Sequence, residues 1–570
     1  THHAKKKTNA SFSHIRDLVV GLDILVNGYI DLARSKTNSF FQVRPPHALA
    51  DLCKKQAFES NPSLLNRHQH KHSPSSQLLN NGGKLVPFNM CLQKFIDYQH
   101  EQVGRQNHGL SSTSTQRLSC AIPAVLTNPP KTSPIADYSN VIRIQGFDRT
   151  FNITDSGLHR PVIIYCIGEN GKRYQQLVKG NDDVRQDMVM MQVFSAVNDF
   201  LSEEKRKQIQ KRVRTYTVVP LSPEVGVMEW VQDTIPIGNY LIDKGSKRGA
   251  HSRYHPEDWA HQECRLKMKE AKETGDPVVM KNTYLDVCKH LKPAFRFFFL
   301  DYFAAGPKDT TQGKNQSVNG SINLARFSHA GTAEWYERRL AYSSSLAVSS
   351  MIGHIMGIGD RHTQNILVDT RTAEVVHIDF GIVFEQGKTL STPETVPFRL
   401  TRDMVDGLGI TGVEGLFKNC CEDTMRCLRR PDNAAALATL AEVFIYDPLY
   451  RWMLSPLQAI KRQRQTDAIV KEEKQSSQQH RNHRNTHSSG HNAASSPNTN
   501  TAVVVEEGNN ASGMREAAER ILTRIRQKLQ GYEDPNDSAL SVEGQVRLLI
   551  ASATSEENLH KIFMGWAPWL

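Results

Sequence analysis

The stretch GIGDRHTQNILVDTRTAEVVHIDFG, from Gly357 to Gly381, decides the fold of this 570-residue chain. Its two apolar runs, ILVD and EVVHID, flank a short polar turn, a pattern that is typical of an antiparallel β-hairpin. A hairpin returns the chain to the edge from which it started. We therefore expect Asn365 and Asp379 to lie together at one end of the hairpin and Asp369 to lie at the far turn.

The acids and the amide of this stretch have a spacing that suits phosphoryl transfer. Four residues separate Asp360 from Asn365, as they separate the base and the metal-binding Asn in the catalytic loop of protein kinases. Asp379 begins an Asp-Phe-Gly turn. Transfer from a nucleotide needs a carboxylate that orients the attacking hydroxyl and oxygen ligands for Mg²⁺. We expect Asp360 to be the catalytic base and Asn365 and Asp379 to be the metal ligands. Turn acids beside a buried hairpin are the structural alternative, which the ordered combination disfavours.

Composition limits the class of protein without choosing the ligand. Hydrophobic residues make up 39% of the chain, and no apolar run approaches the roughly 18 residues that a membrane span needs, so a soluble protein is expected. Nine cysteines without a CxxC repeat favour a reducing compartment over a disulfide framework. The net charge of +11 favours anionic partners but does not decide between nucleotides, nucleic acid and acidic surfaces. The opening residues THHAKKK resemble neither an initiator Met nor a signal peptide, so we expect a fragment of a longer protein.

The order of predicted elements indicates an α+β arrangement of two lobes. A helical pattern, with Ile15, Leu18, Val19, Leu22 and Leu25 on its apolar face, spans residues 12–35. A larger, mostly helical region follows residue 231. Between them, a helix is expected from Asp182 onward. A small sheet with one helix and then a helical body would leave a cleft between lobes for a ligand. The predicted strands are 141–145, 150–154, 161–168, 173–179, 215–221 and 226–231.

The C-terminal part contains a polar insertion followed by two ordered segments. Residues 466–513 form a polar insertion, rich in Ser, Asn and His from 472 onward, that is predicted to be disordered. A shorter insertion at 306–323 is rich in Gly, Asn, Thr and Lys. An amphipathic helix is expected over 514–532. The apolar tail, 538–570, is expected to dock on the rest of the chain, and its Thr554 and Glu557 have the spacing of a helix capping box.

The GDRH motif followed by Asn365 and HIDFG resembles the phosphatidylinositol 3-kinase-related kinases, in which Asp-Arg-His replaces the His-Arg-Asp of ordinary protein kinases. The resemblance implies a bilobal PI3K/protein-kinase-like fold with a helical N-terminal flank, and that His362 stabilises charge on the transferred phosphoryl group. It implies the following division: 1–137, the end of a helical FAT-like region plus a linker; 138–465, the catalytic domain; 466–513, the polar insertion; 514–537, a helical linker; 538–570, a FATC domain.

The same resemblance assigns a nucleotide site to two other motifs. LVKGNDDVRQD implies that Lys179 contacts the ATP phosphates, that Asp187 supports Lys179 and that Asp182 lines the site. GVMEWV resembles the hinge, so that Trp230 covers the adenine and the backbone of Val231 bonds its edge. A solvated strand-end lysine and a plain core tryptophan are the structural alternatives. The remaining residues that the resemblance adds to the nucleotide pocket are Glu229, Leu367 and Ile378.

Three further stretches, 335–350, 397–417 and 565–570, resemble one branch of this family. That branch phosphorylates Ser or Thr followed by Gln and signals DNA double-strand breaks in the nucleus, with ATP and Mg²⁺, or alternatively Mn²⁺, as cofactors. Its implied partners are protein substrates with Ser/Thr-Gln sites, DNA-break sensor proteins that bind upstream of this chain, and a second copy in a homodimer. No membrane partner is expected, and direct DNA contact is left open.

Two alternatives of different kinds accompany this interpretation. A phosphoinositide lipid kinase would need clustered basic residues near the acceptor, whereas residues 382–396 contain one Lys and two Glu. A pseudokinase scaffold would keep the fold for protein contacts only, and the complete set of Lys179, Asp360, Asn365 and Asp379 argues against it. The basic run at 205–214 is interpreted as a solvated face joining a helix to a strand, in preference to a nuclear signal or a DNA patch.

Overall fold

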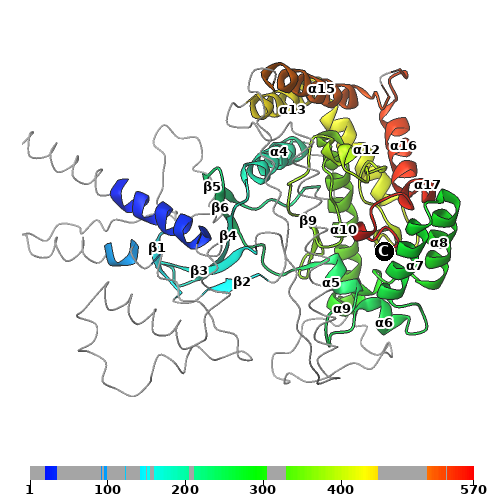
Figure 1. The fold of residues 1–570 in the computed structure, drawn as a ribbon, viewed down its shortest axis with the longest axis horizontal. Helices are drawn as coiled ribbons and strands as arrows, with labels where there is room; N and C mark the ends of the chain where they lie inside the picture. Colours follow the sequence, from blue (N-terminus) through cyan, green and yellow to red (C-terminus); the bar gives the residue numbers. More distant parts are fainter. Residues whose placement is uncertain are drawn as a thin grey trace, which may run out of the picture. The chain divides into compact units, whose positions relative to one another are not determined.

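The computed structural model describes residues 19–34, 92, 95–98, 122, 142–148, 151–154, 160–203, 211–303, 329–446, 510–534 and 536–570. The chain divides into two compact units: the first contains Thr1–Met191 and Tyr216–Val231, and the second contains Gln192–Thr215 and Gln232–Leu570. A sheet dominates the first unit and helices dominate the second, so the predicted α+β class is confirmed (Figure 1). Within the described ranges, no helix is both long and apolar enough to cross a membrane.

The first unit is built on a six-stranded sheet with the order β1-β3-β4-β6-β5, in which β2 pairs with β3. All the pairings in this sheet are antiparallel. Burial alternates along β3, so that Val162, Ile164 and Cys166 enter the core. The strands are β1 (Ile144–Phe147), β2 (Asn152–Ile153), β3 (Val162–Gly168), β4 (Arg173–Gly180), β5 (Val218–Ser222) and β6 (Val225–Glu229).

A helix over residues 19–34 packs against this sheet (Figure 1). Tyr29 is fully buried in a hydrophobic cluster with residues of β3, and its hydroxyl donates a 2.8 Å hydrogen bond to Gln176. The backbone of the helix comes so close to β4 that a methyl group on Gly180 would lie 2.7 Å from the carbonyl oxygen of Ala33. The predicted helix is therefore present over residues 19–34, although Val19 and Leu22, which were expected on its apolar face, are exposed. Residues 12–18 lie outside the described residues.

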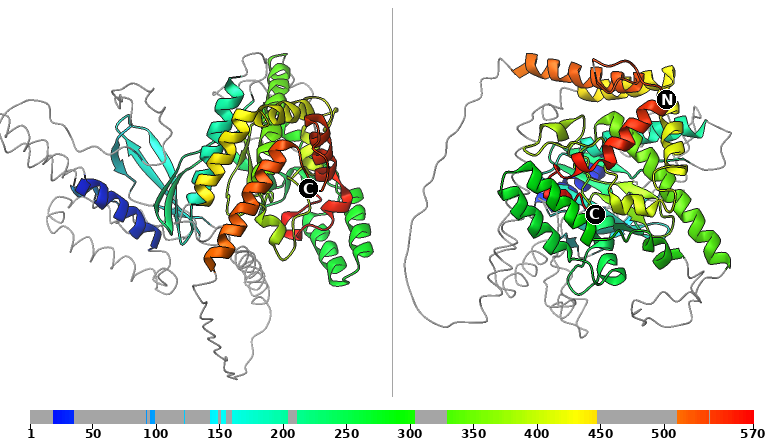
Figure 2. Two further views of the ribbon diagram at one scale, coloured as in Figure 1. Left: turned by 90° about the horizontal axis from the view of Figure 1, so that it is seen from above. Right: turned by 90° about the vertical axis from the view of Figure 1, so that its right-hand side faces the viewer.

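The second unit surrounds α10 (His329–Met356), which packs against α9 (Phe297–Phe303), α12 (Leu416–Leu428) and the strand β9. Its small sheet has the order β7-β8-β9. Figure 2 shows the same elements from two further sides. The remaining elements are α4 (Arg185–Ser202), β7 (Thr234–Pro236), α5 (Ile237–Leu241), α6 (Ala250–Tyr254), α7 (His261–Glu273), α8 (Pro277–His290), β8 (Ile366–Asp369), β9 (Val375–His377), η4 (Gln386–Thr389), α11 (Arg402–Gly407), α13 (Pro431–Ile445), α15 (Asn510–Gln530), α16 (Val542–Thr554), α17 (Glu556–Leu559) and η5 (Met564–Trp566).

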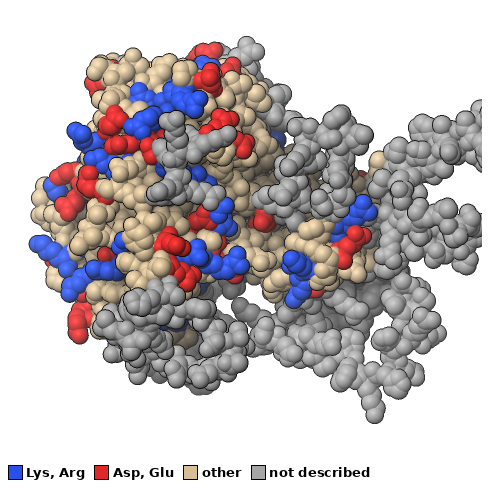
Figure 3. Space-filling model, turned by 180° about the vertical axis from the view of Figure 1, so that it is seen from behind, with Lys and Arg blue, Asp and Glu red and all other residues tan. Residues whose placement is uncertain are grey.

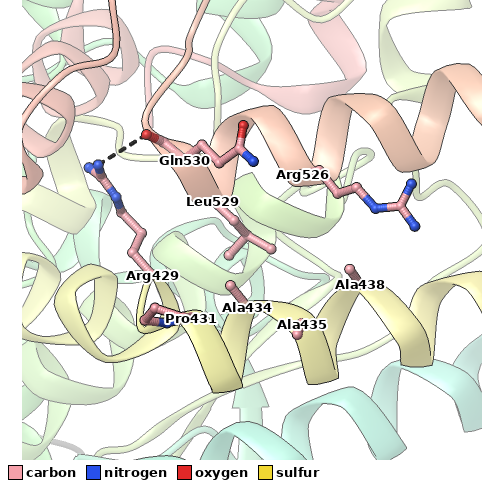
Figure 4. Close-up of a pocket in the computed structure, with 8 residues that line it drawn as sticks. All are labelled: Arg429, Pro431, Ala434, Ala435, Ala438, Arg526, Leu529 and Gln530. Carbon is pink, nitrogen blue, oxygen red and sulfur yellow. Dashed lines mark hydrogen bonds between the residues drawn. The ribbon is translucent and has the colours of Figure 1, made fainter.

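Helices α13 and α15 lie side by side in the second unit (Figures 1 and 2). A hollow of about 480 Å³ separates part of their length, with small alanine side chains on α13 facing Leu529 on α15. Arg429 closes one end by donating to the backbone oxygen of Gln530 at 3.1 Å (Figure 4). Arg526 of α15 forms an ion pair with Glu442 of α13. Packing of small residues and these two polar contacts together hold the pair of helices.

Two predictions about the C-terminal part need correction. Helix α15 begins at Asn510, so residues 510–513 are helical although they belong to the insertion predicted to be disordered. Asn and Ser are favoured near the start of a helix, and Ala favours helix formation. The capping box is wrong because the Thr554 hydroxyl donates to Ile550 within α16, and Ser555 precedes α17. Residues 306–323 and 466–509 lie outside the described residues.

Charges of both signs are interspersed on the second unit, as Figure 3 shows for one face. Part of the basic run at 205–214 is described, and its side chains form ion pairs within this unit. Lys211 pairs with Asp423, Arg212 with Glu374, and Arg214 with both Asp369 and Glu374. Arg212 and Arg214 thus bond acids at the far turn of the β8–β9 hairpin, and Lys211 bonds an acid of α12, which supports a structural role for the end of the run.

Replacing Gly180 by Ala tests the close packing of the N-terminal helix on the sheet. The added methyl group forces the helix away from β4, and we expect a loss of about 1–3 kcal/mol in the stability of the first unit. Gly146→Ala is the control, because nothing lies within 4 Å of its added methyl group. Hydrogen exchange of the amides of β3 and β4 measures both variants. Equal protection in the two variants would contradict this packing.

Candidate active site

The hairpin that the sequence predicts is present in the second unit. In β8 and β9, Ile366 pairs with His377 and Val368 with Val375. At one end, the N–H of Ile378 donates to the carbonyl of Asn365 at 3.0 Å, which places the chain leading to Asp379 beside Asn365. Asp369 lies at the opposite turn, as expected, and accepts two backbone N–H groups there.

Asp360 lies in the loop between α10 and β8, in a left-handed backbone conformation with φ +55°. The Asn365 side-chain amide donates to the Asp360 carbonyl at 3.0 Å, so the predicted base and a predicted metal ligand are directly linked. Burial raises the pKa of the Asp360 carboxyl group, while the nearby His362 and Arg361 oppose that rise. A more basic carboxylate is better suited to accept a proton from a hydroxyl group.

His362 is held in one tautomer by a neighbouring amide. Burial lowers the pKa of the His362 imidazole, which favours the neutral ring. Its Nδ1 atom accepts the N–H of Gln364 at 3.1 Å, so the proton of the neutral ring resides on Nε2. His362 can therefore donate one hydrogen bond from Nε2 to a developing negative charge, which is the role that the resemblance implied.

Arg361, which lies between Asp360 and His362 in the sequence, connects the loop of Asp360 to the end of the β8–β9 hairpin. Its side chain is buried and donates to the carbonyl of Gly359 at 2.8 Å and to that of Ile378 at 2.8 Å. A further hydrogen bond reaches the carbonyl of Asp379. The guanidinium also lies 5.2 Å from the ring centroid of Phe380. No role for Arg361 was expected from the sequence, although its place within GDRH was a signal.

Asp379 and Asn365 have the donor chemistry that a magnesium ion requires. Asp379 is exposed, has φ +59° and is followed by Phe380, which packs edge-on against Phe194 at 5.5 Å. In Asn365 the amide nitrogen is used by Asp360, which leaves the amide oxygen as the metal-binding atom. Among the described residues, no group of three His, Cys, Asp or Glu could hold a metal alone. The two oxygen ligands thus fit an ion that keeps water or substrate phosphates as its other ligands.

The predicted phosphate-contacting residues lie in the first unit. Lys179 is near the end of β4, pairs in register with Gly226 and forms an ion pair with Asp182 at 3.2 Å. Asp187 is buried in the first turn of α4 and accepts the Tyr216 hydroxyl at 3.3 Å. The ion pair agrees with a site shared by Lys179 and Asp182. Support of Lys179 by Asp187 stays a prediction.

Some of the residues predicted to bind adenine belong to the first unit and the others belong to the second. Glu229 ends β6 and exchanges hydrogen bonds with Thr217, and the backbone N–H of Trp230 donates to Gln175 at 3.2 Å. Trp230 and Val231 are half-buried. In the second unit, Leu367 is buried in β8 and Ile378 is half-buried after β9. Their contacts with adenine stay predictions.

The C-terminal tail is fastened to the catalytic loop by Arg399, which the sequence analysis missed. This buried guanidinium donates to the backbone oxygens of Trp566 at 2.5 Å, Ala567 at 2.9 Å and Leu570 at 3.3 Å. It also reaches the carbonyl of Arg361 at 3.4 Å. Burial lowers the pKa of Arg399 to about 9. The expected docking of the tail is confirmed, and the sequence contained no signal that identified Arg399 as its anchor.

Comparisons with known proteins agree with this geometry. Residues 173–454 match the family model "Phosphatidylinositol 3- and 4-kinase", and residues 539–570 match the FATC domain. The chain is 40% identical over 441 residues to the serine-protein kinase ATM of Sus scrofa and 41% identical over 424 residues to the serine/threonine-protein kinase ATM of Arabidopsis thaliana. These matches cover 77% and 73% of this chain but only 13% and 9% of the relatives' lengths.

Solved structures of related kinases also match this chain. The open conformation of CtTel1 is 31% identical to it with a TM-score of 0.61, and the match covers 88% of this chain and 15% of the CtTel1 chain. A complete CtTel1 dimer with C2 symmetry is 29% identical with a TM-score of 0.61 and covers 96% of this chain and 17% of that one. The fold, the FATC tail and the family branch expected from the sequence are thus confirmed.

The pH dependence of tail docking tests the contact between His261 and Trp569. The Trp569 indole donates to His261 Nδ1 at 3.4 Å, and burial lowers the pKa of His261 from 6.5 to about 4. His261 takes up a proton at a higher pH in the unfolded state than in the folded state. The free energy that stabilises the docked tail is therefore at its full value above pH 6.5 and decreases as the pH falls toward 4. The expected decrease is about 1.4 kcal/mol per pH unit, measured by hydrogen exchange of 564–570.

His261→Gln keeps an acceptor and does not titrate, so the tail of this variant should lose less protection at low pH. His290→Gln, which changes an exposed histidine of the same unit, is the matched control. An unchanged slope in His261→Gln would show that His261 does not control the docking.

Proposed function

The chain belongs to the phosphatidylinositol 3-kinase-related kinase family, and on that premise we propose that it is a serine/threonine protein kinase. The reaction transfers the γ-phosphoryl group of ATP to a protein hydroxyl. The observation that carries the proposal is the linked set of Asp360, Asn365 and Asp379 at one end of the β8–β9 hairpin.

Each of these residues, and also His362, Lys179 and Asp182, has a task in the transfer. Asp360 orients the substrate hydroxyl and accepts its proton as the new bond between oxygen and phosphorus forms and ADP leaves. The Nε2–H group of His362 donates to the charge on the phosphoryl oxygens. Asn365 and Asp379 hold Mg²⁺, or alternatively Mn²⁺, which when bound neutralises phosphate charge. Lys179 contacts the phosphates of ATP, and Asp182 lines that site.

The residues that we assign to the nucleotide base are at the end of β6 in the first unit and in the β8–β9 hairpin of the second unit. We assign Trp230 to cover the adenine and the backbone of Val231 to bond its edge. The half-burial of Trp230 supports this assignment, because a ring that is packed wholly into the core offers no face to a ligand. Glu229, Leu367 and Ile378 complete the pocket.

Protein is the preferred acceptor over a phosphoinositide. The segment 382–396 contains one Lys, and this Lys388 already pairs with Glu385, so the segment lacks a cluster of cations for an inositol phosphate. The curated relatives are named as serine or serine/threonine protein kinases. Preference for Gln after the phosphorylated residue is proposed from the resemblance of 397–417 and 565–570 to the ATM branch.

The cellular role is proposed from the same branch. We assign the protein to signalling of DNA double-strand breaks in the nucleus, with recruitment by break-sensor proteins. The chain covers only 13% of the pig relative, so regions outside it are expected to bind those partners. A homodimer is proposed because CtTel1 forms a dimer with C2 symmetry. Direct contact with DNA is not part of the proposal.

An assay of phosphate transfer tests the proposed function. Wild type and Asp360→Asn receive Mg²⁺, labelled ATP, matched peptides with Ser-Gln or Ser-Ala, and phosphatidylinositol vesicles. We expect wild type to label the Ser-Gln peptide and Asp360→Asn to be slower by on the order of 10²–10⁴ because the proton acceptor is lost. The control Asp432→Asn changes an exposed acid of the same unit and should retain the wild-type rate.

Labelled lipid without labelled peptide would identify a phosphoinositide kinase. Mg²⁺-dependent ATP binding without transfer to any acceptor would favour a pseudokinase scaffold. Near-normal transfer by Asp360→Asn would contradict the assignment of the base.

A further inference from the structure

The backbone of the proposed base is held by a carboxylate far away in the sequence. Glu394 accepts the N–H of Asp360 through Oε1 at 2.6 Å. Hydrogen bonds of a backbone N–H to a carboxylate are shorter and stronger than those between neutral groups. Within the described part of the chain, no Lys or Arg forms a salt bridge with Glu394, so the contact with Asp360 is the principal bond of its side chain.

Two glycines make room for this carboxylate. A methyl group on Gly359 would lie 2.7 Å from Glu394 Oε2, and a methyl group on Gly387 would come closer still. Any other residue at these positions would displace the carboxylate or the backbone. One of these glycines immediately precedes Asp360, and the other lies in the segment that carries Glu394. The surroundings thus form a cradle for the side chain.

The segment that contains Glu394, residues 382–397, is itself attached to the catalytic loop. Gly359 donates to the carbonyl of Ile382 at 2.9 Å, and Glu385 donates to the carbonyl of Gly357 at 3.1 Å. Glu394 then returns to the same region by donating its N–H to Gly387 at 3.0 Å. These backbone hydrogen bonds hold Glu394 beside Asp360, so the position of its carboxylate is set by the backbone of the segment.

The hydrogen bond from Asp360 to Glu394 stabilises a strained backbone conformation at Asp360. A left-handed backbone at a residue other than glycine costs roughly 1–2 kcal/mol, and Asp360 has φ +55°. Its carbonyl is fixed by the amide of Asn365, and its N–H is fixed by Glu394. Both backbone groups are therefore bonded, and loss of either contact lets the loop relax and move the catalytic carboxylate.

We propose that Glu394 is a positioning residue for Asp360, acting through the backbone of the base and not through the substrate. The proposal rests on the proposed kinase function. Burial raises the pKa of Glu394 to about 7, and an amide at this position would keep an acceptor oxygen for the same N–H. Glu394→Ala removes the acceptor, and Glu394→Gln keeps it.

The experiment compares two reactions of the whole chain that use the same base. One is transfer to the Ser-Gln peptide, and the other is hydrolysis of ATP by water without peptide. We expect Glu394→Ala to lower kcat of both reactions by on the order of tenfold to a hundredfold, with unchanged KM for ATP and for peptide, because the base is misplaced. Glu394→Gln should remain within about fivefold of wild type. Glu414→Ala, at an exposed glutamate, is the control.

Different outcomes separate positioning from its alternatives. A higher KM for peptide with normal ATP hydrolysis would mean that Glu394 contacts the substrate, since it also lines a pocket of about 280 Å³, and would overturn the proposal. If Glu394→Ala does not fold, the glutamine variant decides, because a loss as large as that of Asp360→Asn would contradict positioning through an acceptor. Absence of both reactions in wild type would instead contradict the kinase function.

Discussion

The buried guanidinium of Arg361 is the constraint on which the site depends. Arg361 bonds the carbonyls of Gly359, Ile378 and Asp379, so one side chain connects the loop of the base to the loop of a metal ligand. Guanidinium is suited to this task because it presents five donors in a rigid plane. The two acids Asp360 and Asp379 repel one another, and Arg361 holds their loops together by bonding backbone carbonyls instead of the carboxylates.

Further contacts extend from this centre to distant parts of the second unit. Glu394 fixes the N–H of Asp360, and Arg399 connects the carbonyl of Arg361 with the backbone of the C-terminal tail. In each case a charged side chain bonds backbone groups, which gives a geometry that does not change when neighbouring side chains adopt other rotamers. The tail is thereby part of the support of the catalytic loop, which gives a physical reason for a FATC domain to follow a kinase domain.

The sequence allowed prediction of the hairpin and of the residues at its end because their signals are local. Apolar runs around a turn identify β8 and β9, and the spacing of Asp360 and Asn365 survives folding unchanged. Glu394 and Arg399 could not be predicted because their partners are 34 and 167 residues away and no periodicity records such contacts. The exposure of Leu22 could not be predicted for a similar reason, since the surface against which the helix at 19–34 packs decides which of its apolar residues are buried.

The central claim is that Asp360 and Asp379 act as one constellation, and a double-variant comparison tests it most directly. The rate of phosphate transfer is measured for Asp360→Asn, Asp379→Asn and the variant with both changes. Residues that act as a unit give non-additive losses, so the account predicts that the double variant is no slower than the slower single variant. Losses that multiply in the double variant would show that the two acids act independently and would contradict the account.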